Sequence, residues 1–273
     1  MLSPETYKEL YQAIAVRRSV RTYNGQPMEP ESMEALLKFE SEIPSLPLEG
    51  TRNDSATGNF DIKICGLDTA EPVKLGSYGV IRRAPSFIAL TAPTTDSEEE
   101  AALMATGAAF KAEFMVLWLA ANGLGSCWMS GTVNRKKLAA SLGISDSDNI
   151  LACIPFGYAA GKATMVERVM ASFVHARSRK PFTELFKVDE DSGNCLIEPG
   201  RESEFSAAEA RRIFEAVRLA PSGCNRQPWR GWVDSEGNPV LYFDNKTSDM
   251  NALDRGIALA HAYIAATAGD DRE

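Results

Sequence analysis

Three arginines lie within five residues near the start of the chain, where segment 17–21 reads Arg-Arg-Ser-Val-Arg. Guanidinium groups form paired, charge-assisted hydrogen bonds with phosphate oxygens, and the hydroxyl group of Ser19 can add another. One interpretation is therefore an anion site. The alternative is a solvated helix end, where arginine interacts favourably with the helix dipole.

A second basic segment, 177–181 (Arg-Ser-Arg-Lys-Pro), allows the same two interpretations. Together the two segments hold six of the 29 Lys and Arg residues. The whole chain has 37 Asp and Glu residues and a net charge of −8, which argues against nucleic acid as a partner. Positive charge is thus concentrated in two short stretches of an acidic chain.

Segment 220–229 (Ala-Pro-Ser-Gly-Cys-Asn-Arg-Gln-Pro-Trp) gathers amide and hydroxyl groups beside an aromatic ring. Such a set can bind the hydrogen-bonding edge of a flat heterocycle. The alternative is an ordinary turn rich in Pro, Gly and Asn. We interpret Cys224 as a small buried residue rather than a redox thiol.

Other chemistries find little support. The five cysteines form no CxxC pair, so neither a disulfide framework nor a zinc site is expected. His175 and His261 are too few for a His-rich metal site and are the two candidates for the base of a catalytic triad. The glycines of 123–128 lack the third member of a dinucleotide fingerprint, and 157–163 is one residue short of a P-loop. The N-terminus has no apolar signal region, so we expect a cytoplasmic protein without a membrane partner.

The elements that would position these groups can be read from the hydrophobic pattern. We expect helices at 4–16, 30–40, 101–122 and 136–142, and strands at 60–66, 85–92 and 151–158. Ser3 and Pro4 are typical of a helix start, and the glycines of 123–125 of a helix end. The helix at 101–122 is apolar nearly all round, which is typical of the buried centre of a domain.

The second part of the chain repeats the first. Segment 205–222 matches 28–45 without gaps in helical pattern, and both end in Pro-Ser. Further matches follow in order, a strand at 241–244 with 60–63 and a helix at 255–266 with 106–117. This series predicts an internal duplication, with a full half at 1–187 and a truncated half at 188–273 that opens on a polar connector.

These motifs together resemble those of the FMN-dependent nitroreductase family. Segment 16–23 is similar to the opening motif of the family, and 220–229 to its second motif. Segment 123–131 (Gly-Leu-Gly-Ser-Cys-Trp-Met-Ser-Gly) resembles its flavin-facing loop, and 177–181 its C-terminal phosphate motif. The resemblance implies an α+β, three-layer fold with a mixed or antiparallel central sheet flanked by helices.

The order of the motifs departs from the family pattern. The Pro-Ser-x-x-Asn motif ordinarily follows the Arg-Arg-Ser motif in the same subunit, yet here 43–49 (Ile-Pro-Ser-Leu-Pro-Leu-Glu) lacks its Asn, Gln and Trp. The intact copy lies in the second half. Since family members are intertwined homodimers that hold FMN between subunits, the resemblance implies a fused, intertwined pseudo-dimer with one FMN per chain. We expect a monomer, and leave a homodimer open.

The resemblance also implies residue roles. Arg17, Arg18, Ser19, Arg177 and Arg179 would hold the phosphate and ribityl groups, Arg21 would lie near N1–C2=O, and backbone N–H groups near Ser130 and Gly131 would face N5. The full cofactor-binding set comprises Arg17, Arg18, Ser19, Arg21, Trp128, Met129, Ser130, Gly131, Arg177, Arg179, Pro221, Ser222, Gly223, Asn225 and Gln227. No catalytic side chain and no metal are required, because the flavin carries the electrons.

The implied function is an FMN-dependent NAD(P)H oxidoreductase. NADH or NADPH would reduce the flavin, and a nitroaromatic, a quinone or a similar small acceptor would then take up the electrons in a ping-pong cycle. The sequence does not distinguish the two donors. The alternative is a flavin-binding or flavin-sequestering protein without turnover.

Overall fold

The computed structural model describes residues 1–46, 59–66, 81–131, 135, 138–139, 148–161, 178–188, 205–234, 237–243 and 249–269. The helices in this part of the chain are α1 (Pro4–Val16), α2 (Pro30–Glu42), α3 (Glu98–Ala121), α6 (Phe182–Leu185), α7 (Ala207–Leu219) and α8 (Asp249–Ala268), with a short 3-10 helix at Gly223–Asn225. The strands are β1 (Asp61–Gly66), β2 (Ser86–Pro93), β3 (Gly125–Ser126), β4 (Asp148–Gly157), β5 (Phe186–Lys187), β6 (Trp229–Val233) and β7 (Pro239–Phe243).

Local signals define where the helices begin and end. Ser3 caps α1 by accepting a hydrogen bond from the amide of Thr6 at 3.2 Å, as expected from the Ser-Pro start. Ser206 and Glu209 form a capping box at the start of α7. Gly123 follows α3 with a φ of +75°, a conformation that favours glycine. The helix expected at 136–142 falls largely outside the described residues.

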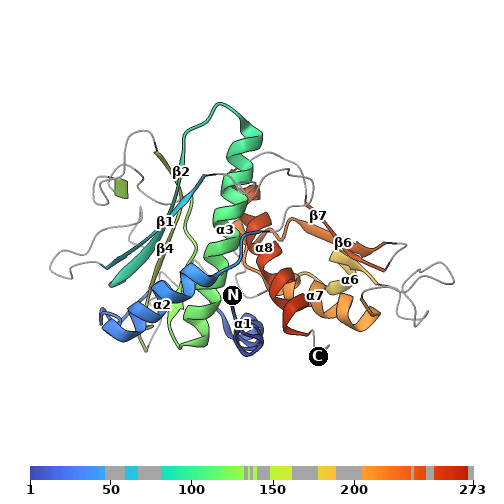
Figure 1. The fold of residues 1–273 in the computed structure, drawn as a ribbon, viewed down its shortest axis with the longest axis horizontal. Coiled ribbons are helices and arrows are strands. Elements are labelled where there is room, and N and C mark those ends of the chain that lie inside the picture. The colour runs from blue at the N-terminus through green and yellow to red at the C-terminus, as the bar shows by residue number, and fades with distance from the viewer. Residues whose placement is uncertain are drawn as a thin grey trace.

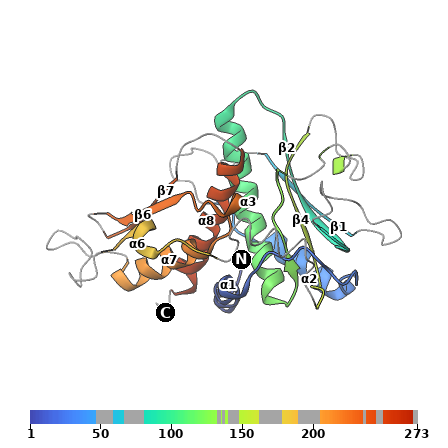
Figure 2. The ribbon, with the colours of Figure 1, turned by 180° about the vertical axis from the view of Figure 1, so that it is seen from behind.

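The elements form three layers (Figures 1 and 2). One outer layer is a four-stranded sheet of order β1-β2-β4-β3, in which all neighbours are antiparallel. The other is a three-stranded sheet of order β5-β6-β7, with one parallel and one antiparallel pairing. Helices α1, α3, α7 and α8 lie between the sheets, so the expected α+β class and the three layers are confirmed. The expected central sheet flanked by helices is wrong, because the apolar helix α3 is buried between the two sheets and packs against α1 and α8.

The central helix α3 is buried along most of its length. By length and composition it could cross a membrane, with a mean hydropathy of 1.4 over its best window, but 78% of that window is buried inside the protein. Its side chains pack against α1, α8 and β2 in the main core cluster. The helix therefore forms the centre of the fold, as its pattern predicts.

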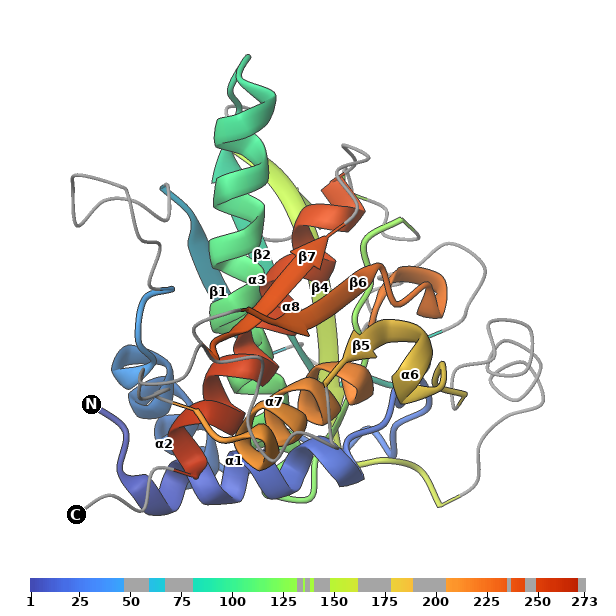
Figure 3. The ribbon, with the colours of Figure 1, turned by 90° about the vertical axis from the view of Figure 1, so that its right-hand side faces the viewer.

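Helices α3 and α8 run in the same direction and cross each other (Figures 1 and 3). Thr106 Oγ1 donates to the carbonyl oxygen of Ala252 at 3.2 Å, and further along Glu113 contacts His261. Gly256 lies between these points, where a Cβ atom would come within 2.8 Å of both Ala109 Cβ and the Phe110 amide nitrogen. The glycine thus permits a close helix crossing.

Candidate functional site

The turn between α7 and β6 has an unusual backbone. Cys224, Asn225 and Gln227 have positive φ angles of 52°, 55° and 52°, although none of them is glycine. Residues in this region cost of order 1 kcal/mol or more each and persist only where surrounding contacts impose them. Residues 221–227, which we call the strained turn, are therefore held by their neighbours.

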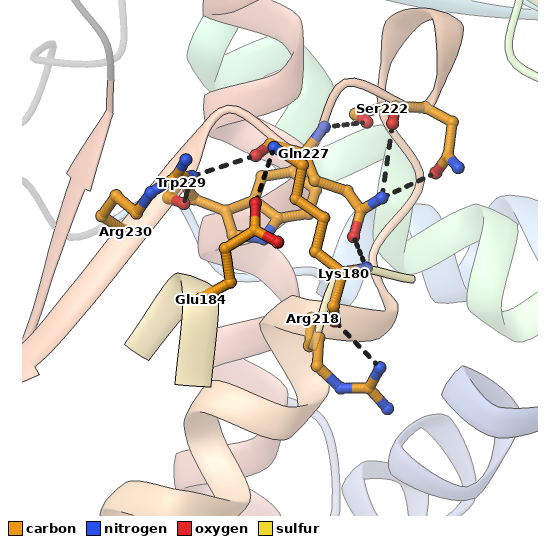
Figure 4. A network of polar contacts seen from close by, with 8 residues as sticks. Lys180, Glu184, Arg218, Ser222, Gln227, Trp229 and Arg230 are labelled. Atoms are coloured by element: carbon orange, nitrogen blue, oxygen red, sulfur yellow. Dashed lines mark hydrogen bonds and ion pairs between the residues drawn. The ribbon is translucent and has the colours of Figure 1, made fainter. Parts of the chain in front are cut away.

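Segment 178–180 supplies contacts on one side of the strained turn. Asn225 donates from Nδ2 to the carbonyl oxygen of Ser178 at 3.0 Å and accepts at Oδ1 from Arg179 at 3.1 Å. The amide of Lys180 donates to Gln227 Oε1 at 2.9 Å (Figure 4). The structure thus brings together the second basic segment and the Pro-Ser-Gly-Cys-Asn motif, which lie about 40 residues apart in the sequence.

Gln227 stabilises the strained turn from within. Its side chain is buried, and its backbone amide donates to Ser222 Oγ at 2.9 Å (Figure 4). The side-chain Nε2 lies 3.3 Å from the carbonyl oxygen of Asn225 and 3.4 Å from its Oδ1. The Gln227 side chain therefore shapes the turn.

Positive charge gathers beside the strained turn. Burial, Arg17 and Arg218 together lower the pKa of Arg179 to about 10. Arg179 also donates to the carbonyl oxygen of Leu219, and Arg218 is paired with Glu215. Arg17 Nε is buried and finds no acceptor among the described residues. Guanidinium groups of like charge repel each other, and a bound anion offsets this repulsion. The guanidinium groups of Arg17 and Arg179 therefore fit a phosphate group.

The first basic segment lies against the loop that follows α3. The amide of Val20 donates to the carbonyl oxygen of Ser126 at 2.8 Å, and Ser19 pairs with Ser126 in a β-bridge. Gly125 permits this approach, because a Cβ atom there would come within 2.6 Å of Val20 Cγ2. Segments 17–21 and 123–131 are therefore neighbours in space.

Trp128 in this loop is fixed by a buried polar network. Its Nε1 donates to Glu113 Oε2 at 2.7 Å, and Glu113 Oε1 lies 2.9 Å from His261 Nε2. His261 Nδ1 lies 2.9 Å from the carbonyl oxygen of Ala216 and must be the donor, because a carbonyl can only accept. His261 therefore joins Glu113 on α3 to the end of α7. The network links α3, α7, α8 and the loop.

The predicted site residues can now be placed. The contacts above include Arg17, Ser19, Trp128, Arg179, Ser222, Asn225 and Gln227. Met129 is buried and pairs through its backbone with Cys153 on β4. None of these contacts involves Arg18, Ser130 or Gly131, of which Arg18 and Gly131 are exposed and Ser130 is half-buried. Arg21 accepts through its carbonyl oxygen from the amide of Arg82, Pro221 is half-buried, and Arg177 lies outside the described residues.

The interpretation of Cys224 as a buried residue is wrong, since the structure exposes it. Cys224 lies in the turn between α7 and β6, where it adopts a left-handed backbone, and not in the apolar core. His261 is fully buried between Glu113 and Ala216, which makes it unsuitable as an accessible catalytic base.

Sequence reasoning missed two buried carboxylates beside the site, Glu113 on α3 and Asp254 on α8. Asp254 Oδ1 accepts from the amide of Gly223 at 2.8 Å, and its Oδ2 lies 3.4 Å from Arg226 Nη2. A signal was present for Glu113, which interrupts a largely apolar helical stretch, but not for Asp254, which is followed directly by Arg255. Such an acid is either exposed or paired in the core, and the pattern alone does not decide between the two.

The fold and the clustered motifs define a nitroreductase-like protein. A sequence model of the family described as "Putative TM nitroreductase" matches residues 9–266, and the chain belongs to this family. No curated protein matches the sequence.

Among solved structures, a putative nitroreductase from Thermotoga maritima MSB8 is 23% identical, with a TM-score of 0.54, over 94% of this chain and 82% of that chain. A nitroreductase family protein from Streptococcus pneumoniae TIGR4 is 17% identical, with a TM-score of 0.48, over 64% and 98% of the two chains. An FMN-dependent nitroreductase from Clostridium difficile R20291 is 19% identical, with a TM-score of 0.41, over 56% and 88%.

Proposed function

We propose that the protein is an FMN-dependent NAD(P)H oxidoreductase that reduces nitroaromatics, quinones or similar small acceptors. The observation that carries this proposal is the buried Arg17 Nε, which finds no acceptor among the described residues, together with the bond from Arg179 to Asn225 in the strained turn. The charge of Arg17 also helps to lower the pKa of Arg179. These two guanidinium groups belong to the two segments that resemble phosphate motifs. Membership of a nitroreductase family supports the choice of FMN as the phosphate-bearing ligand.

In this proposal, the residues have separate tasks. Arg17, Arg18, Ser19, Arg177 and Arg179 hold the phosphate and ribityl groups, while Asn225 and the strained turn bind from the other side. Arg21 and the backbone near Ser130 and Gly131 face the ring, with Trp128 in the wall. When bound, FMN accepts hydride and passes on the electrons, which is why no catalytic side chain is required.

We also propose that the chain is a fused pseudo-dimer with one FMN. The repeat places α2 and α7, each of 13 residues, at equivalent positions. Helices α3 and α8 cross each other, and Gly256, which corresponds to Gly107, lies against Thr106 and Phe110. Contact between equivalent positions is what a two-fold axis produces. Segment 43–49 (Ile-Pro-Ser-Leu-Pro-Leu-Glu) lacks the Asn and Gln of 221–227, so we expect the second site to be vacant.

We place the reaction in the cytoplasm, where the redox conditions keep thiols reduced. In the described part of the chain, Cys65, Cys127, Cys153 and Cys224 are free.

The anion site can be tested with two flavins. Wild-type protein should bind FMN, and Arg17→Ala should weaken FMN binding about 10- to 100-fold, since a hydrogen bond to a charged group contributes about 1.5–3 kcal/mol. Binding of riboflavin, which lacks the phosphate, should not change. Lys63→Ala on β1 is the control, because it removes the same unit of charge from an exposed strand. Equal effects on FMN and riboflavin would refute the assignment of Arg17.

A turnover assay distinguishes an enzyme from a flavin-sequestering protein. NADH or NADPH added without oxygen should bleach the bound flavin, and a quinone should restore its colour. Initial rates at several fixed acceptor concentrations should give parallel double-reciprocal lines. Persistent colour in the presence of both donors would favour the non-catalytic alternative.

A further inference from the structure

A buried carboxylate reaches the strained turn from α8. Asp254 is 2% exposed, and its Oδ1 accepts from the amide of Gly223 at 2.8 Å. Its Oδ2 lies 3.4 Å from Arg226 Nη2, and the same nitrogen donates to Asn251 Oδ1 at 2.9 Å. Asp254 therefore contacts the two residues that flank the left-handed pair Cys224 and Asn225.

The strained turn is held by two separate parts of the chain. Segment 178–180 binds Asn225 and Gln227, as Figure 4 shows for Gln227 and Lys180. Asp254, on helix α8, binds Gly223 and Arg226. Arg226 Nε also donates to the carbonyl oxygen of Gly223 at 3.2 Å, so the Asp254 contacts converge on the two residues that flank Cys224 and Asn225.

Holding a turn with a buried aspartate carries an unfavourable desolvation free energy. Burial disfavours the ionised carboxylate, and an ordinary turn can be stabilised by backbone contacts alone. Within this turn, three residues that are not glycine keep positive φ angles, which requires continuous support from outside. Costs of this kind concentrate where a backbone must hold a ligand-binding shape.

We propose that Asp254 is a positioning residue that holds the strained turn in the shape that binds the cofactor. This inference rests on the proposed function, because it assigns the turn to the FMN site. Asp254 does not touch the ligand in this proposal. It acts through the Gly223 amide and Arg226, and so fixes where the Asn225 side chain points.

The electrostatics of Asp254 agree with this role. Burial raises the pKa of Asp254 to about 6, and the Gly223 amide and the Arg226 guanidinium partly offset the rise. The carboxylate is consequently ionised at neutral pH, when its acceptor strength toward Gly223 is greatest.

Two substitutions distinguish the loss of the hydrogen-bond acceptor at position 254 from the loss of its negative charge. Asp254→Asn keeps an oxygen for the Gly223 amide, whereas Asp254→Leu removes it at similar size. We expect the Kd for FMN to rise about tenfold or more in the Leu variant and to change by less than about threefold in the Asn variant. Ile264→Ala, which shortens a buried side chain on the same helix, is the control and should retain FMN affinity. A folded Leu variant with wild-type affinity would overturn the proposal.

A second measurement needs neither FMN nor a variant that folds poorly. In the ¹⁵N-labelled apoprotein, the Gly223 amide resonance should titrate between pH 5 and 7 with an apparent pKa of about 6. This titration should be absent in Asp254→Asn. If wild-type protein binds no FMN, the proposed function fails, while the Gly223 titration still reports whether Asp254 holds the turn. An amide that does not respond to pH would sink the Asp254 assignment even if FMN binds.

Discussion

The buried network of Trp128, Glu113 and His261 allows a quantitative prediction. Glu113 is fully buried and accepts from Trp128 Nε1 at 2.7 Å, while its other oxygen lies 2.9 Å from His261 Nε2. Glu113→Leu removes both interactions and leaves Nε1 of the half-buried Trp128 and Nε2 of the buried His261 without this partner. Each such atom costs about 1–3 kcal/mol, so the variant should lose about 2–6 kcal/mol of unfolding free energy.

Glu113→Gln provides the comparison, because the amide can satisfy both neighbours. Its oxygen can accept from Trp128, and its nitrogen can donate to His261, whose Nδ1 already donates to the Ala216 carbonyl oxygen. One amide hydrogen then lacks an acceptor, at a cost of about 1–3 kcal/mol. The Leu variant should therefore be less stable than the Gln variant by about 1–3 kcal/mol.

Urea unfolding followed by circular dichroism measures this difference directly. Met115→Leu on the same helix controls for a change of apolar shape, and should cost less than about 1.5 kcal/mol. Equal stabilities of the Leu and Gln variants would show that the Trp128 and His261 contacts contribute nothing measurable. The reasoning about the hydrogen bonds of Glu113 with Trp128 and His261 would then be wrong.

Three further predictions concern other parts of the fold. Because the pKa of Asp254 is raised from 3.8 to about 6, the folded protein takes up this proton before the unfolded chain does. As the pH falls from 7.5 to 4, wild type should therefore gain about 2 kcal/mol relative to Asp254→Asn in urea unfolding, and a constant difference would contradict this. Gly256→Ala should lower the unfolding free energy by about 1–3 kcal/mol through overpacking against α3, and an unchanged midpoint would argue against the close crossing. Ser206→Ala should lose about 1 kcal/mol by removing the capping box of α7, as seen in the thermal midpoint.

Local patterns predicted most of the elements. The start of α1 at Pro4 follows from Ser3 and Pro4, and the buried α3 follows from its apolar circumference. Strands β1, β2 and β4 lie within a few residues of the expected ranges. The pattern did not reveal β5, a strand of two residues, because so short a run carries no periodicity. The expected central sheet was wrong as well, because the helices form the middle layer between two sheets.

The candidate site was predicted by residue type and only partly by position. The motifs carrying Arg17, Arg179 and Asn225 could be found because guanidinium groups and amides cluster in short segments. The exposure of Cys224 could not, because it depends on a left-handed backbone that neighbouring elements impose. Nor could the roles of Asp254 and His261, since a polar residue in an apolar helix gains its meaning from the partner it meets.

The sequence by itself thus determined which helices and strands form and which segments carry charge and hydrogen-bonding groups, because these depend on contacts between near neighbours. Only the tertiary structure decided that the charge of Arg17 acts on Arg179 and that segment 178–180 and Asp254 both hold the strained turn. Those contacts join residues that are far apart in the chain. They exist because α3 and α8 pack against each other and bring the two parts of the chain together.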